Sequence, residues 1–210
     1  MFDCLIIGGG VAGVSCAMVL GSAHEKPFML DKNVGIIAHQ KASMLQDALF
    51  NNAYGIAPGT LGSQLLNQSL EDLHQTYPHI KQIKEEKVVS IIENQACFLV
   101  TTNETIYEAK TVVVAINSSN PFTIAGCLQP FVIPHKKSLA KKNRIQLANE
   151  DHLVGKNIYV AGTLAGHRSQ LAIASGSWAA VATDLLTLWN GGVETHAHDS
   201  IRIKEYKKGK

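Results

Sequence analysis

The sequence predicts an α/β domain of three layers: a parallel sheet, helices outside it, and an antiparallel β-meander on the other side. Three patterns carry this prediction. Residues 3–20 read as an apolar strand, a glycine-rich turn and an apolar helix. Residues 87–108 hold three β-prone stretches separated by turn residues, and residues 157–189 read as strand, turn and long apolar helix. At 210 residues, the chain can bury one full core and is short for two complete domains.

Composition excludes several classes of protein. Hydrophobic residues make up 46% and charged residues 17% of the chain, which is typical of an ordinary folded domain. A formal net charge of +2 is too small to argue for a nucleic-acid partner. The apolar start lacks a positive leading segment and contains glycines, so we expect neither a signal peptide nor a membrane span. Four widely spaced cysteines without a C-x-x-C pair indicate a reducing, cytoplasmic location.

The first predicted unit is a strand, a turn and a helix. Residues 3–7 form an apolar run that stops at Gly8, and residues 11–20 suit a buried helix. Pro27 introduces a second short apolar run at residues 28–30, which we interpret as a buried parallel strand ending at Asp31. Residues 33–62 read mostly as loop, with a short helical piece at 43–50.

The remaining elements follow from the same periodicities. Residues 117–156 show no convincing period, and their prolines and lysines indicate an exposed connection. The other predicted elements are a surface helix at 61–77, strands at 87–93, 97–102, 105–108, 111–116 and 157–161, and a helix at 170–189.

A glycine motif predicts what the first unit binds. Gly8, Gly10 and Gly13 form G-x-G-x-x-G directly between a predicted strand and helix. One glycine permits the tight turn, one lets backbone approach a pyrophosphate, and one lets helix and strand pack closely. The helix near Val11 offers unpaired N–H groups and a positive dipole end to phosphates. Asp31, about twenty residues on, would accept hydrogen bonds from an adenosine ribose and repel a 2′-phosphate, favouring FAD or NAD over NADP.

Several segments together resemble a known family. Two segments of this chain, MFDCLIIGGGVAGVSCAMVL and FMLDK, resemble the FAD domain of two-dinucleotide flavoproteins. A third, NNAYGIAPGTLGSQLL, resembles the E-N-x-P-G segment of thioredoxin reductases. The stretches TVVVAINSS and NIYVAGTLAGHRSQLAIASGSWAA resemble that family's A-T-G strand end and closing segment. The chain is thus similar to thioredoxin reductase-like FAD-dependent oxidoreductases, of the pyridine nucleotide-disulfide oxidoreductase superfamily, over residues 1–118 and 156–192.

The resemblance implies a Rossmann-like FAD-binding domain within residues 1–192, built from those two segments, with residues 193–210 as a C-terminal tail. It also implies FAD as cofactor and a homodimer. Asn52 would approach the flavin, Val88 would contact the adenine through its backbone, and Gly162 and Thr163 would face the ribitol. The helix start at Gln170 and Leu171 would approach the pyrimidine edge of the flavin. Motif and resemblance together assign these residues to the cofactor: Gly8, Gly10, Val11, Ala12, Gly13, Asp31, Lys32, Asn52, Val88, Ala115, Gly162, Thr163, Gln170 and Leu171.

The sequence also departs from that family. Its members insert an NADPH domain, commonly with a C-x-x-C, where this chain has only the short connection 119–155. The aspartate of the family's G-D is Thr163, and its A-T-G is Ala115, Ile116 and Asn117. We therefore predict a small FAD-dependent oxidoreductase reduced by an external donor, a protein or a small molecule. The alternatives are a non-catalytic FAD- or nucleotide-binding sensor, or a site for NAD or an ADP-like ligand.

Other residues carry weaker signals. His167 and Arg168 precede the closing helix and could donate a proton or hold an anion near the flavin, or simply cap the helix. Cys127 reads as a structural thiol rather than a nucleophile. Core or dimer contacts are the better interpretation for Trp178 and Trp189.

The tail carries two further clusters. His196, His198 and Asp199 form H-x-H-D, which we interpret as a chance surface cluster, so no metal is predicted. The lysines that follow suit a solvated terminus without a role: Lys204, Lys207, Lys208 and Lys210.

Overall fold

A six-stranded sheet of order β13-β14-β9-β1-β2-β5 forms the centre of the computed structural model, which describes residues 1–39 and 43–200. Its strands are β1 (Cys4–Ile7), β2 (Val34–Ala38), β5 (Lys81–Lys84), β9 (Val112–Val114), β13 (Leu153–Gly155) and β14 (Ile158–Val160). The sheet is parallel except at its edge, where β13 runs antiparallel to β14. The carboxyl ends of β2, β1, β9 and β14 therefore share one edge.

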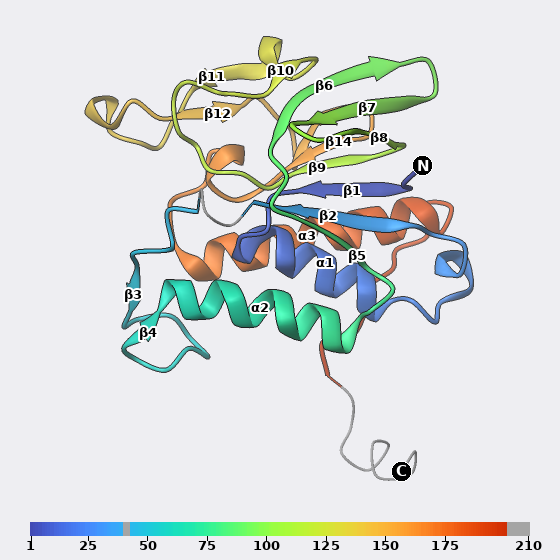
Figure 1. Cartoon of the computed structure of the whole chain (residues 1–210), viewed down its shortest axis with the longest axis horizontal. Helices are drawn as coiled ribbons and strands as arrows, with labels where there is room; N and C mark the ends of the chain where they lie inside the picture. The colour runs from blue at the N-terminus through green and yellow to red at the C-terminus, as the bar shows by residue number, and fades with distance from the viewer. Residues whose placement is uncertain (40–42, 201–210) are drawn as a thin grey trace.

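The sheet separates helices from a meander, as Figure 1 shows. The helices α1 (Val11–Ser22), α2 (Gly62–Thr76) and α3 (Leu171–Trp189) lie below it in that view. The meander above it consists of β6 (Val88–Asn94), β7 (Cys97–Thr102) and β8 (Ile106–Ala109), joined by β10 (Ala125–Gly126). Each face of the sheet has its own hydrophobic core. The predicted three-layer α/β fold is confirmed.

Short elements complete the chain. Two small antiparallel ribbons pair β3 (Leu49–Phe50) with β4 (Thr60–Leu61), and β11 (Val132–Pro134) with β12 (Ile145–Leu147). The 3₁₀ turns are η1 (Pro27–Met29), η3 (Gln129–Phe131), η4 (Ala140–Lys142) and η5 (Gly162–Ala165). The connection expected at 119–155 thus contains β10–β13 and pairs with both larger sheets. The tail lysines Lys204, Lys207, Lys208 and Lys210 lie outside the described residues.

Small residues let α1 lie close to its neighbours. Cys16 and Ala17 are fully buried on this helix, in one cluster with Trp178 of α3. The helix is apolar on most sides because it packs between the sheet and α3. By length and a mean hydropathy of 1.4, α3 could also span a membrane. Here its buried side chains pack into the core: Trp178, Val181, Ala182, Leu185 and Leu186.

The predicted second strand is wrong in position. Residues 28–30 lie in or beside the 3₁₀ turn η1, where Pro27 occupies the first turn, a position that suits its fixed φ. The strand that pairs with β1 is β2, a fully buried run whose register sets Val34 opposite Cys4. The helical piece expected at 43–50 is also wrong, because residues 44–47 form a turn before β3. The apolar run 34–38 is longer and pairs with a parallel strand on each side, so it forms the buried strand in place of the shorter run 28–30 after Pro27.

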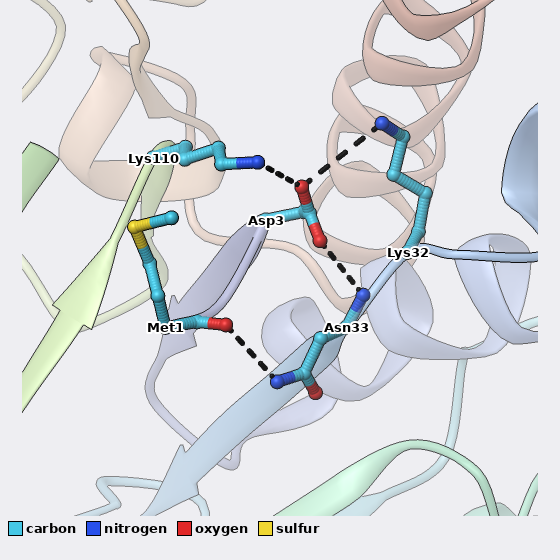
Figure 2. A network of polar contacts seen from close by, with 5 residues as sticks. All are labelled: Met1, Asp3, Lys32, Asn33 and Lys110. Atoms are coloured by element: carbon cyan, nitrogen blue, oxygen red, sulfur yellow. Dashed lines mark hydrogen bonds and ion pairs between the residues drawn. The ribbon is translucent and has the colours of Figure 1, made fainter. Parts of the chain in front are cut away.

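The amino edge of the sheet is held by a carboxylate (Figure 2). Asp3 Oδ2 accepts a hydrogen bond from the Asn33 N–H at 2.9 Å, and Asp3 Oδ1 lies 2.9 Å from Lys110 Nζ and 4.0 Å from Lys32 Nζ. Burial by itself would raise the pKa of Asp3, but the Asn33 hydrogen bond and Lys110 outweigh it and lower this pKa below its ordinary value. The network ties the starts of β1, β2 and β9 together.

This network predicts a pH-dependent contribution to stability. Because the folded state lowers the pKa of Asp3, its contribution is full above the ordinary value of 3.8 and disappears as pH falls through the folded-state pKa. We expect Asp3→Asn to reduce the free energy of unfolding by about 1 kcal/mol at neutral pH. Urea unfolding of both proteins across pH 2–7 measures this difference, which should shrink toward the acid end; a difference independent of pH would contradict the assignment.

Candidate functional site

A cavity of about 460 Å³ runs along the carboxyl edge of the sheet. The residues that follow four adjacent strands line it: His39 after β2, Gly8 after β1, Ala115 after β9 and Ala161 after β14. The first residues of α1 and α3 also line it. This is the edge at which α/β sheets bind ligands, because the strand ends and the helix starts meet there.

Gly8 and Gly13 shape the turn under the cavity. Gly8 has φ +121°, and a Cβ there would collide with the Ala115 carbonyl oxygen. A Cβ on Gly13 would collide with the carbonyl oxygen of Gly8, so this glycine lets α1 approach the end of β1. Both positions exclude a larger residue, as the motif predicts.

Gly10 leaves the start of α1 open to the cavity. It is the N-cap of α1, and a Cβ built on it meets no atom within 4 Å. Neither Gly10 nor Val11 and Ala12 has a polar side chain to cap the helix, and no acidic residue stands in its first turn. The helix start therefore presents its N–H groups and positive dipole end to the cavity, which is the arrangement that binds a pyrophosphate.

A second helix start closes the other end of the cavity. Gln170 is the N-cap of α3, and both Gln170 and Leu171 line the cavity. Gly162 begins η5 with φ +66°, and its N–H donates to Ser177 Oγ of α3 at 2.8 Å. This bond fixes the end of β14, and with it Thr163, against the closing helix.

The remaining walls combine apolar and polar surfaces. Leu45, Phe50 and Ile116 give an apolar wall, next to Asn52. Arg144, which precedes β12, lines the cavity from the connection 119–155. Among the described lining residues, His39 and Arg144 are the ionisable ones, and none carries a carboxylate. With two helix starts facing inward, the cavity suits an anionic ligand.

The structure brings most of the predicted cofactor residues together. The cavity is lined by these members of the predicted set: Gly8, Gly10, Val11, Ala12, Asn52, Ala115, Gly162, Thr163, Gln170 and Leu171. Gly13 lies behind the turn and acts through packing. Val88 does not line the cavity; its side chain is buried between sheet and meander.

Asp31 and Lys32 lie at the opposite edge of the sheet. Asp31 is exposed and precedes β2 instead of ending a strand, and Lys32 contacts Asp3 at the amino end of β1 (Figure 2). The reason for assigning Asp31 to the ribose, its place at the end of the second strand, is therefore removed. The residue that follows the true second strand is His39. The run VGIIA before it was the signal that sequence reasoning missed.

His39 also lines a second hollow of about 310 Å³ beside the first. This hollow lies where β2 and β5 end, and Lys84, Glu85 and Asn67 contribute to its walls. Parallel strands that end next to the glycine turn are the usual place for the adenosine half of a dinucleotide. The two hollows together extend the site from β5 to β14.

The thiols stand apart from the cavity. All four cysteines are free, and none is among its lining residues. Cys4 and Cys16 are buried in the core, and burial raises the pKa of both thiols. Burial, with Glu93 nearby, also raises the pKa of Cys127. None of these three thiols is activated toward thiolate.

The candidate histidines also lie outside the cavity lining, whereas Trp178 belongs to it. His167 packs against His152 with ring centroids 5.5 Å apart, and burial, His152 and Lys137 lower the pKa of His167. The rings of His196 and His198 meet edge-on at 4.8 Å, but no group of metal-ligating side chains forms among the described residues. Trp178 is buried in the core, as predicted, and also lines the cavity.

The fold and the cavity define a dinucleotide-binding α/β protein. The family model of pyridine nucleotide-disulphide oxidoreductases matches residues 2–167, so the chain belongs to this family. No curated protein matches the sequence.

Solved structures share the fold at low sequence identity. A thioredoxin reductase from Gloeobacter violaceus superposes with a TM-score of 0.70 at 12% identity, over 96% of this chain and 99% of that chain. An oxidoreductase from Agrobacterium tumefaciens gives 0.67 at 11%, over 89% and 98%. A ferredoxin-flavin thioredoxin reductase from Clostridium acetobutylicum gives 0.64 at 17%, over 90% and 98%.

The glycine turn predicts two different outcomes for one added methyl group. Gly13→Ala should lower the free energy of unfolding by about 2–3 kcal/mol, because its Cβ collides with the Gly8 carbonyl oxygen. Gly10→Ala meets open space, and the loss of a better N-cap should cost under about 1 kcal/mol. Denaturant unfolding of both variants measures this; equal losses would contradict the geometry.

Proposed function

We propose that the chain binds FAD along the carboxyl edge of its sheet and acts as a small oxidoreductase reduced by an external donor. One observation carries the proposal: a single cavity joins the ends of β2, β1, β9 and β14 to two helix starts, with no carboxylate among its described lining residues. A long ligand with a central pyrophosphate matches that shape and charge. Membership of the oxidoreductase family supports a flavin as the bound cofactor.

The residues present fit the parts of FAD. Gly8, Gly10 and the first N–H groups of α1 would hold the pyrophosphate. The hollow around His39 would take the adenosine, and Thr163 would face the ribityl chain. The apolar wall of Leu45 and Phe50 would cover the ring system. Ala115, Val11 and Ala12 would line the path between these parts.

Bound FAD would supply hydride or single-electron transfer. The protein's contribution is electrostatic and steric. The start of α3 at Gln170 and Leu171 would stabilise negative charge on a reduced ring, because a helix N-terminus carries a positive partial charge. Asn52 would stand beside the ring and offer an amide for orientation.

The motifs of these 210 residues support an external donor. They hold one G-x-G-x-x-G and no C-x-x-C. No cysteine lines the cavity within the described part of the chain, and the pKa of Cys127 is raised, so no internal dithiol relay is supported. Electrons for the proposed reaction would therefore come from another molecule.

We also propose a cytoplasmic homodimer. The exposed apolar side chains of Ile173 and Leu188 on α3 support an interface along this helix. The free cysteines support a reducing compartment.

A nucleotide-binding sensor is the second candidate. It is favoured by Thr163, which lines the cavity where the resembling family has an acidic residue. A sensor would bind its nucleotide without turnover. An oxidoreductase would transfer electrons from a chemical reductant to oxygen or a dithiol acceptor. Steady-state assays of FAD-loaded protein with these partners separate the two.

The first test is the cofactor itself. Protein purified without added cofactor should carry the yellow absorption of oxidised flavin, and mass spectrometry of the released ligand should give FAD. Gly10→Leu should weaken FAD binding by at least about tenfold, because its side chain enters the cavity at the helix start. Gly176→Leu is the matched control, since Gly176 also faces open space but lies outside the cavity. Wild-type protein that stays colourless with added FAD would refute the proposal.

The position of β2 predicts a contrast between two residues at its ends. Asp31→Ala should leave the dissociation constant for FAD unchanged, because Asp31 lies at the amino edge of the sheet. His39→Ala should weaken FAD binding by about two- to tenfold, because His39 lines both hollows. Isothermal titration of each variant checks this. The reverse order of effects would restore Asp31 as the ribose-binding residue.

A further inference from the structure

Trp178 places a buried hydrogen-bond donor at the cavity. The side chain lines the cavity and is only 1% exposed. Its indole Nε1 is fully buried and has no hydrogen-bond partner among the described residues. This N–H lies beside Gly162, since a Cβ built on that glycine would stand 3.1 Å from Nε1.

An unpaired buried N–H needs a physical reason. The indole nitrogen can only donate, and buried tryptophans usually find an acceptor because a lost hydrogen bond destabilises the fold. The neighbouring hydroxyl of Ser177 already accepts the Gly162 N–H at 2.8 Å. A ligand oxygen in the cavity would satisfy the indole. An oxygen that satisfies it would have to enter the space beside Gly162, which also lines the cavity.

The position of this donor along the site selects the part of the ligand. Gly162 follows β14, which is two strands from β1 and its glycine turn. A pyrophosphate held at the start of α1 would therefore leave the Trp178 indole, which lies beside Gly162, on the flavin side of the cavity. In FAD, the ribityl chain with its hydroxyl groups joins the pyrophosphate to the flavin ring.

We propose that the Trp178 Nε1–H donates a hydrogen bond to a ribityl hydroxyl oxygen of the bound flavin. This inference rests on the proposed function and adds a cofactor-binding residue from the middle of α3. Gly162 is needed for it, because any side chain at this position would stand against the indole nitrogen. The ribityl chain would thus be held by neutral groups, Trp178 and Thr163.

The test is Trp178→Phe, which removes the N–H and keeps an aromatic ring. The matched control is Trp189→Phe, the same change on the same helix, where the ring packs near Lys32 Nζ at 5.6 Å, away from the cavity. Titration with FAD and with ADP, which has the pyrophosphate and no ribityl chain, gives the readout. We expect Trp178→Phe to weaken FAD binding by about three- to tenfold and to leave ADP binding unchanged. Trp189→Phe should change neither.

The outcomes separate two failures. Wild-type protein that does not bind FAD would overturn the proposed function and this inference together. Wild-type binding with a Trp178→Phe variant that binds FAD equally well, or that loses FAD and ADP affinity alike, would overturn the inference alone. Thermal unfolding without ligand shows whether the variant is folded. The rise in melting temperature on adding FAD should be smaller for Trp178→Phe than for wild type.

A measurement on wild-type protein avoids the substitution. The sequence has two tryptophans, so two indole N–H signals appear in a nitrogen-15 correlation spectrum, and Trp189→Phe assigns them. Added FAD should move the Trp178 indole proton downfield, as a new hydrogen bond does, and leave the Trp189 signal in place. ADP should leave both unmoved. An upfield or absent shift of the Trp178 proton with FAD would overturn the proposal.

Discussion

The close approach of α1 to the end of β1 is the constraint on which the rest of the site depends. Gly13 lies against the Gly8 carbonyl group, and Gly8 lies against that of Ala115. These contacts bring the helix start and the ends of β1 and β9 together at one place. Any larger residue would push the helix away from the sheet. The N–H groups of α1 would then no longer face the cavity between the strand ends.

The same constraint determines how the end of the chain completes the site. Because α1 lies close to the sheet, α3 can pack on α1 through small residues and bury Trp178 in their common core. The bond from the Gly162 N–H to Ser177 Oγ then joins the end of β14 to this helix. One rigid core thus positions both helix starts. The second start requires no separate domain, because β14 inserts beside β9 in the same sheet.

The sequence predicted those parts of the structure that local sterics decide. Gly8, Gly10 and Gly13 could be assigned because their spacing between a strand and a helix is a local pattern, although the contact that excludes a Cβ at Gly8 comes from the distant Ala115. The second strand could not, since residues 28–30 and 34–38 are both apolar runs and the choice depends on pairing with β1 and β5. Asp31 was misplaced with that strand, and His39 was missed. Arg144 comes from a segment without periodicity, and an indole without an acceptor is visible only in three dimensions.

The displaced acid changes how the site can select a nucleotide. A carboxylate at the end of the second strand would read the ribose hydroxyls and repel a 2′-phosphate. Here His39 stands at that place, and Arg144 is the other ionisable residue described in the cavity. That place carries no carboxylate, but Glu71 and Glu85 line the adjoining hollow around His39, so repulsion of a 2′-phosphate would come from α2 and from the end of β5. On the β14 side, the donors that we propose for the cofactor, Trp178 and Thr163, would meet the half of the ligand in which FAD differs from NAD, and would favour FAD through its ribityl flavin.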